Sequence, residues 1–82
     1  MVNVIRTPEQ LALVLRGRRN VAGLTQQAAG SSVGLLPKTI HALESTPERC
    51  RVESLFKLLS ALDFELVLQP KQPRTRNARR EW

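Results

Sequence analysis

The apolar positions of the chain fall into four stripes with helical spacing, followed by one short segment in which apolar and polar residues alternate. Apolar residues three and four apart lie on one face of a helix, whereas alternation is typical of a half-buried strand. The pattern predicts helices that begin at Pro8, after Thr25, at Pro37 and near Arg51. The inward-facing residues expected on them are Leu11, Val14 and Leu15; Ala28, Ala29 and Val33; Ile40 and Leu43; and Leu55, Leu58, Leu59 and Leu62.

Capping residues support the first two helix starts. Thr7 and Gln10 stand on either side of Pro8 in the spacing of a capping box, and proline suits the first helical position. Gly23 is expected to end the first helix, after which Thr25 caps the second.

Glycine and proline interrupt the chain between the second and third helices. Gly34 allows the positive φ of a tight turn, Pro37 suits the start of a new helix, and Gly30 lets a neighbouring backbone come close. Pro47 is expected to mark the end of the third helix. Two short helices at a steep angle are the arrangement in which the second enters a DNA major groove while the first contacts the backbone. The punctuation therefore predicts a DNA-binding helix-turn-helix.

The alternating segment FELVLQP predicts one short C-terminal strand. Phe64, Leu66 and Leu68 share one face, and no other part of the chain has the pattern of a partner strand. Because an unpaired strand leaves its backbone groups without hydrogen bonds, we expect the same strand of a second molecule to complete a two-stranded ribbon across a two-fold axis. The alternative is an extended segment that packs on its own domain.

Length and charge narrow the picture further. With 82 residues the chain makes one domain with a modest core, and its net charge of +6 points to a polyanionic partner. Residues 69–82 contain five basic residues and one acid, so they carry +4 of that charge. We expect a helix-turn-helix and dimerisation domain over 1–68 and a flexible basic tail over 69–82, although a tail kept basic for solubility is the alternative.

Other classes of function find little support in the sequence. It offers no catalytic triad, phosphate loop, metal-ligand cluster or cofactor motif, so we expect a protein that is not an enzyme and that uses neither metal nor cofactor. Cys50 has no partner for an internal disulfide, and no apolar run is long enough for a membrane span, so a cytoplasmic location is expected. Phe56 and Phe64 belong in a core or dimer seam, which disfavours a stacking platform for single strands.

Several residues in and around the second and third helices resemble the lambda-repressor-like helix-turn-helix family of the xenobiotic-response-element type. The matching residues are Thr25, Gln26, Ala29, Gly34, Thr39, Ile40, Leu43, Glu44 and Pro47. The resemblance runs from about Pro8 to Leu62, and it implies a four- to five-helix DNA-binding domain.

The resemblance also implies roles for individual residues. The positions that meet base edges are Pro37, Lys38, His41 and Ala42, and those that meet phosphates are Thr25, Gln26 and Thr39. Arg19 and Glu44 match a structural ion pair. Two residues depart from the family pattern: Ala28 replaces a capping-box acid, and Leu36 cannot cap the third helix. Few residues would therefore read the bases directly, namely Lys38 and His41 together with apolar contacts. For His41 a plain surface role is the alternative.

A narrower resemblance is to the HipB antitoxin family, which pairs with the HipA serine/threonine kinase toxin. It is carried by GLTQ at 23–26, by the run at 45–68 and by the terminal Glu81 and Trp82. The family implies a homodimeric autorepressor of a palindromic operator. It also implies a basic tail that helps to hold the toxin, with Arg79, Arg80 and Trp82 as the residues involved. The alternatives are a repressor without a toxin and a toxin-binding module that no longer reads DNA.

Overall fold

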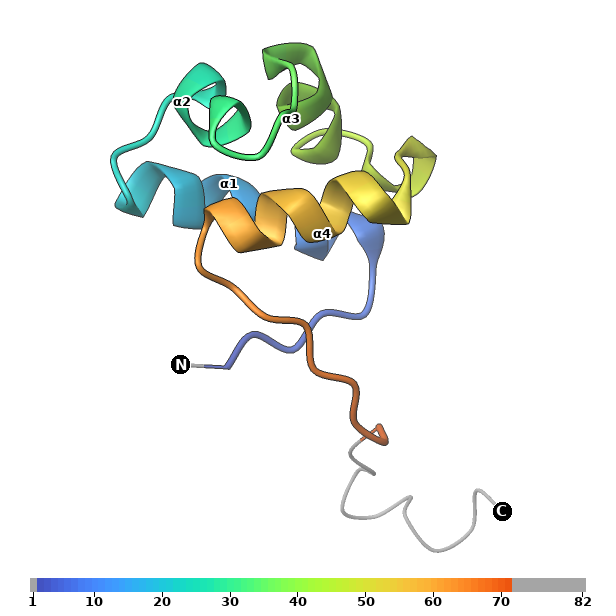
Figure 1. Cartoon of the computed structure of the whole chain (residues 1–82). Coiled ribbons are helices and arrows are strands. Elements are labelled where there is room, and N and C mark those ends of the chain that lie inside the picture. The colour runs from blue at the N-terminus through green and yellow to red at the C-terminus, as the bar shows by residue number, and fades with distance from the viewer. Residues whose placement is uncertain (1, 72–82) are drawn as a thin grey trace, which may run out of the picture.

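The computed structural model describes residues 2–71, which form four α-helices and one 3-10 helix. The elements are α1 (Pro8–Val21), α2 (Gln26–Ser31), α3 (Pro37–Leu43), η1 (Pro47–Arg49) and α4 (Val52–Ala61). Figure 1 shows α2 and α3 lying over α1 and α4, while the segments that lead to both termini leave on the side of the domain opposite α2 and α3. The mainly helical fold and its four predicted helices are confirmed. None of the helices in this part of the chain is long and apolar enough to cross a membrane.

Local sequence explains where α1 begins and ends. The Thr7 hydroxyl accepts a hydrogen bond from the Gln10 amide at 3.1 Å, and the Gln10 side chain accepts one from the Thr7 amide at 3.2 Å. This closed capping box satisfies two backbone donors that a helix start would otherwise leave free. At the other end α1 stops just before Gly23, as predicted, and Gly23 takes a φ of +73° that turns the chain toward α2.

The α2–α3 turn depends on close backbone packing. Gly34 has a φ of +76°, and the amide of Leu35 donates to the carbonyl of Gly30 at 2.8 Å. A Cβ on Gly30 would collide with the carbonyl oxygen of Leu35, so only glycine fits the position. The third helix stops at Leu43, four residues before Pro47, and Pro47 begins η1 rather than directly ending α3.

The inward face of α2 differs from the predicted one. Ala29 and Gly30 are buried, whereas Ala28, predicted to face inward, is exposed. Neighbouring residues of a helix point about 100° apart, so the closeness of Gly30 to Leu35 turns Ala28 away from the core. The core itself contains Leu15, Ala29, Ile40, Leu43, Leu58, Leu59 and Leu62.

The C-terminal segment (residues 64–71) has no regular secondary structure, so the predicted strand is not found within residues 2–71. A strand requires a neighbour for its backbone hydrogen bonds, and these residues have none in the single chain. Phe64 instead packs half-buried against the core, and its amide donates to the Leu59 carbonyl at 2.8 Å. Leu66 and Leu68 remain 51% and 89% exposed. Of the predicted tail, residues 72–82 lie outside the described residues.

Two glycine substitutions should have opposite effects on stability. Gly30→Ala should lower the free energy of unfolding by about 1–3 kcal/mol, because the added methyl group meets backbone that has no room to move. Gly17→Ala, in the exposed middle of α1 with open space around its Cα, should raise it by roughly 0.5–1 kcal/mol. Urea unfolding followed by far-UV circular dichroism measures both. A Gly30→Ala variant as stable as the wild type would contradict the close packing at this turn.

Candidate nucleic-acid interface

The outward side of α3 presents most of the residues expected to meet DNA bases. Lys38 and His41 are exposed, and Ala42 is partly exposed, while Ile40 and Leu43 anchor the opposite side in the core. Residues 38, 41 and 42 share one side of the helix because they are three and four positions apart. The structure thus brings these predicted residues together on one surface.

The start of α3 is apolar and lacks a side-chain cap. Leu36 occupies the N-cap position without a side-chain hydrogen bond, as the sequence predicts, and Pro37 follows it. The side chain of Leu36 is 62% exposed. It lies directly before the predicted base-contacting residues. From the sequence, Leu36 is predicted only to be a missing cap, because the hydrophobic periodicity does not indicate whether its side chain is exposed.

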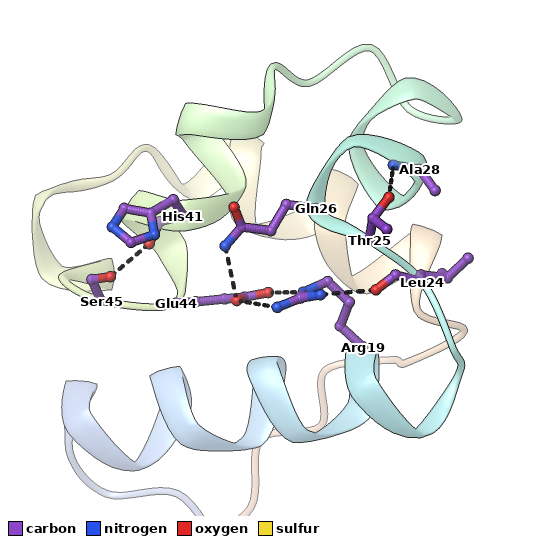
Figure 2. A network of polar contacts seen from close by, with 8 residues as sticks. All are labelled: Arg19, Leu24, Thr25, Gln26, Ala28, His41, Glu44 and Ser45. Atoms are coloured by element: carbon purple, nitrogen blue, oxygen red, sulfur yellow. Dashed lines mark hydrogen bonds and ion pairs between the residues drawn. The ribbon is translucent and has the colours of Figure 1, made fainter.

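The start of α2 holds two of the residues expected to meet phosphates. Thr25 is exposed, and its hydroxyl accepts a hydrogen bond from the Ala28 amide at 3.0 Å, which leaves the hydroxyl hydrogen available to an anion. The Gln26 side-chain amide is half-buried and donates to Glu44 Oε1 at 3.4 Å, as Figure 2 shows. Its second N–H is not used by that bond. Thr39, the third such residue, is partly exposed on α3.

A buried ion pair lies beneath this surface. Arg19 Nε donates to Glu44 Oε2 at 2.6 Å and Arg19 Nη2 to Glu44 Oε1 at 3.0 Å, a two-point contact between residues 25 positions apart (Figure 2). The remaining terminal nitrogen of Arg19 donates to the Leu24 carbonyl at 2.8 Å. The ion pair that the family resemblance implied is therefore present in the structure.

Burial makes this pair a strong structural constraint. Glu44 is 6% exposed. The hydrogen bond to its carboxylate raises the pKa of Arg19, and the negative charge of the carboxylate adds to this effect, whereas burial of the guanidinium opposes it. A carboxylate in such surroundings needs several donors to offset its lost hydration. Arg19 of α1 and Gln26 of α2 supply them, while Glu44 itself caps the end of α3. One buried group thus holds all three helices in register.

Charge on the exposed surface of α2 and α3 is sparse. The helix α2 has no acidic or basic residue, and the one permanently charged side chain of α3 is that of Lys38. The site is therefore suited to a few specific polar contacts together with apolar contact. Strong nonspecific attraction of a polyanion would have to come from charges elsewhere in the chain.

The remaining predicted functional residues are placed differently. Arg79, Arg80 and Trp82 lie outside the described residues. Of the dimerisation residues, Leu66 and Leu68 are exposed, whereas Phe64 packs on the core of its own chain.

The side chains in the described part of the chain show little potential for metal binding or nucleophilic chemistry. Within residues 2–71 no three His, Cys, Asp or Glu side chains gather as a metal site would require. Burial, and secondarily the charge of Glu48, raises the pKa of the Cys50 thiol, whose sulfur donates to the Thr46 carbonyl at 3.6 Å. A raised pKa lowers the thiolate fraction and so the reactivity of this cysteine at neutral pH.

Comparison with known proteins identifies similar antitoxins. The chain is 30% identical over 64 residues to Antitoxin HipB of Escherichia coli strain K12, a match that covers 78% of this chain and 73% of that protein. Antitoxin HipB of Escherichia coli O6:H1, strain CFT073, is also 30% identical, with 78% of this chain and 68% of that protein covered. No family model matches the sequence.

Solved structures give the same result. The fold is similar to a HipB variant in complex with an O2 20mer, with a TM-score of 0.83 and 26% identity over 88% of this chain and 100% of that one. It is also similar to a chain of a HipA–HipB–O2–O3 complex, with a TM-score of 0.82 and 27% identity over 87% of this chain and 100% of that one.

Removing the charge of Glu44 should destabilise the domain. Glu44→Gln keeps the shape of the side chain but leaves Arg19 without its counter-ion in a mostly buried place, so the free energy of unfolding should fall by about 3 kcal/mol. Glu53→Gln makes the same chemical change in the exposed pair with Lys57 and should cost less than about 0.5 kcal/mol. Urea unfolding of both variants measures the difference, and equal losses would contradict a structural role for the buried pair.

Proposed function

Because the chain belongs to the HipB antitoxin family, we propose that it binds a palindromic DNA operator as a homodimer, represses its own operon and neutralises a HipA-like serine/threonine kinase toxin. In this proposal it is a binding protein and not an enzyme. The observation that carries the DNA-binding part is the outward side of α3. This side of α3 carries exposed polar residues, whereas the opposite side is buried in the core. The turn at Gly34 gives α3 a direction different from that of α2.

Base recognition in this proposal belongs to α3. Lys38 is exposed, and a lysine donates to O6 and N7 of guanine in the major groove. His41, one turn further along, is able to donate to or accept from a base edge. Pro37 and Ala42 offer apolar contact to thymine methyl groups, and the exposed Leu36 extends this apolar surface. With so few polar groups, part of the specificity would come from the shape of the DNA.

Phosphate contacts in this proposal fix the orientation of α3. Thr25 and Gln26 at the start of α2 and Thr39 on α3 have hydrogen-bond donors available to phosphate oxygens. The bond from Gln26 to Glu44 supports this role because it restrains a long side chain before DNA arrives, which lowers the entropy lost on binding.

Dimerisation is proposed to occur through the C-terminal segment. Leu66 and Leu68 have exposed side chains, and the backbone groups of residues 65–68 have no backbone hydrogen bond within residues 2–71. Both observations support pairing of residues 64–68 with the same residues of a second copy. Phe64 would form the base of the ribbon from its place on the core. Two copies related by a two-fold axis would meet half-sites about 34 to 36 Å apart, one turn of B-form DNA.

Toxin neutralisation rests on family membership. A related HipB chain occurs in a complex with HipA and O2–O3, which supports a ternary assembly for this protein as well. The segment that leads to residues 69–82 leaves the domain on the side away from α2 and α3 (Figure 1). This exit point supports a role for the tail in binding a second protein.

Loss of Lys38 should weaken binding to the operator. Lys38→Ala should raise the Kd for the operator about tenfold and relax specificity at one base pair of each half-site, because a direct contact to guanine is removed. Fluorescence anisotropy with the operator and its point variants, at fixed salt, measures both effects. Lys57→Ala on α4 removes the same charge outside α2 and α3 and serves as the control. An unchanged operator affinity for Lys38→Ala would show that α3 does not read the bases in this way.

Removal of residues 69–82 should separate toxin binding from DNA recognition. The truncated chain should lose at least about tenfold in affinity for the kinase toxin, since tryptophan and arginine residues contribute most at protein interfaces. Its preference for the operator over random DNA should persist, while overall DNA affinity falls modestly with the lost positive charge. Calorimetry with the toxin and anisotropy with DNA test the two arms. Unchanged toxin binding would rule out a role for the tail in holding the kinase.

A further inference from the structure

The side chain of Arg18 connects α1 to the point where α4 ends. Its Nε donates to the carbonyl oxygen of Leu62 at 3.1 Å, in a partly buried place. Leu62 is the C-cap residue of α4, and the carbonyls at a helix end lack partners within the helix. A cation there also interacts favourably with the helix dipole. Arg18 therefore satisfies and stabilises the end of a helix that lies 44 residues away in the sequence.

The same side chain holds the first residue of the C-terminal segment. The guanidinium carbon of Arg18 lies 5.3 Å from the centre of the Phe64 ring, within the range of a cation–π contact. Between Leu62 and Phe64 the chain turns through Asp63, whose φ of +60° is left-handed. The Phe64 amide closes this turn by donating to the Leu59 carbonyl at 2.8 Å. Arg18 thus contacts the residues on both sides of the turn that sets the direction in which the chain leaves α4.

We propose that Arg18 is a positioning residue for dimerisation, which fixes the exit direction of the C-terminal segment so that Leu66 and Leu68 are presented to a second copy of the chain. The inference rests on the proposed function, because it concerns the homodimer ribbon described above. It goes beyond that function in assigning a role to a residue of α1 that lies outside the ribbon and outside the proposed DNA contacts.

Preorganisation is the physical reason for this role. A segment that is free to leave α4 in many directions loses conformational entropy when a ribbon forms, and this loss weakens association. With Phe64 held between the core and Arg18, the first residue of the segment is already in place before the second copy arrives. The exposed residues that follow then start from a narrower set of positions.

The experiment compares dimer dissociation constants of the full chain by sedimentation equilibrium. Arg18→Ala should raise the dissociation constant about tenfold, because a C-terminal segment that is no longer held in place loses more conformational entropy when the ribbon forms. Arg16→Ala is the matched control, since Arg16 is an exposed arginine on the same helix, and it should stay within about twofold of the wild type. Arg18→Lys keeps a cation and a donor, so it should recover most of the loss.

A purely structural role is excluded by measuring at a temperature at which circular dichroism shows every variant to be fully folded. In a Phe64→Leu background the ring is gone, so Arg18→Ala should then change the dissociation constant by a smaller factor than in the wild type. If the wild type dimerises and Arg18→Ala dimerises equally tightly, this inference is overturned while the proposed dimer stands. If the wild type stays monomeric at all concentrations, the proposed dimer itself is wrong.

Discussion

The buried carboxylate of Glu44 is the group on which the arrangement of the helices depends. It accepts two hydrogen bonds from Arg19 of α1 and one from Gln26 of α2, and it stands at the end of α3. A buried charge is tolerated only when its hydrogen-bond donors are in place. The helices α1 and α2 must therefore lie where their donors reach the carboxylate, and α3 must end where it places the carboxylate between them. For a domain with so few core residues, this requirement fixes orientation more sharply than nonspecific apolar contact can.

Small residues allow the DNA-facing helices to be as short and as close as they are. The helix α2 has six residues and α3 has seven, too few to be stable on their own. Their stability comes from packing, and the absence of a side chain at Gly30 lets the backbone at Leu35 approach α2 directly. The same tight turn gives α3 its separate direction. Stability and the presentation of Lys38 thus have one structural cause.

Two neighbouring residues of α1 connect the two sides of the molecule. Arg19 reaches Glu44 beneath the proposed DNA-binding surface, whereas Arg18 reaches Leu62 and Phe64, where the C-terminal segment begins. Adjacent residues on a helix point about 100° apart, so one helix is able to support two surfaces at once. Figure 1 shows α2 and α3 on one side of the domain and the departing C-terminal segment on the other.

Much of the fold followed from the sequence alone, because helix starts and turns depend on local chemistry. Thr7, Thr25 and Pro37 placed three helix starts correctly, and the positive φ of Gly34 was predictable from the lack of a side chain. The residues of the candidate site could be predicted only from family resemblance. The ion pair between Arg19 and Glu44 is an example, since sequence spacing cannot pair residues that are 25 positions apart. Tertiary structure decided the rest. It turned Ala28 outward, because the face that a helix of fewer than two turns buries is chosen by its neighbours. It also placed the Phe64 ring against the core and beside Arg18. Whether residues after α4 form a strand or a helix-ending turn depends on contacts with segments far away in the sequence, which the local pattern does not contain.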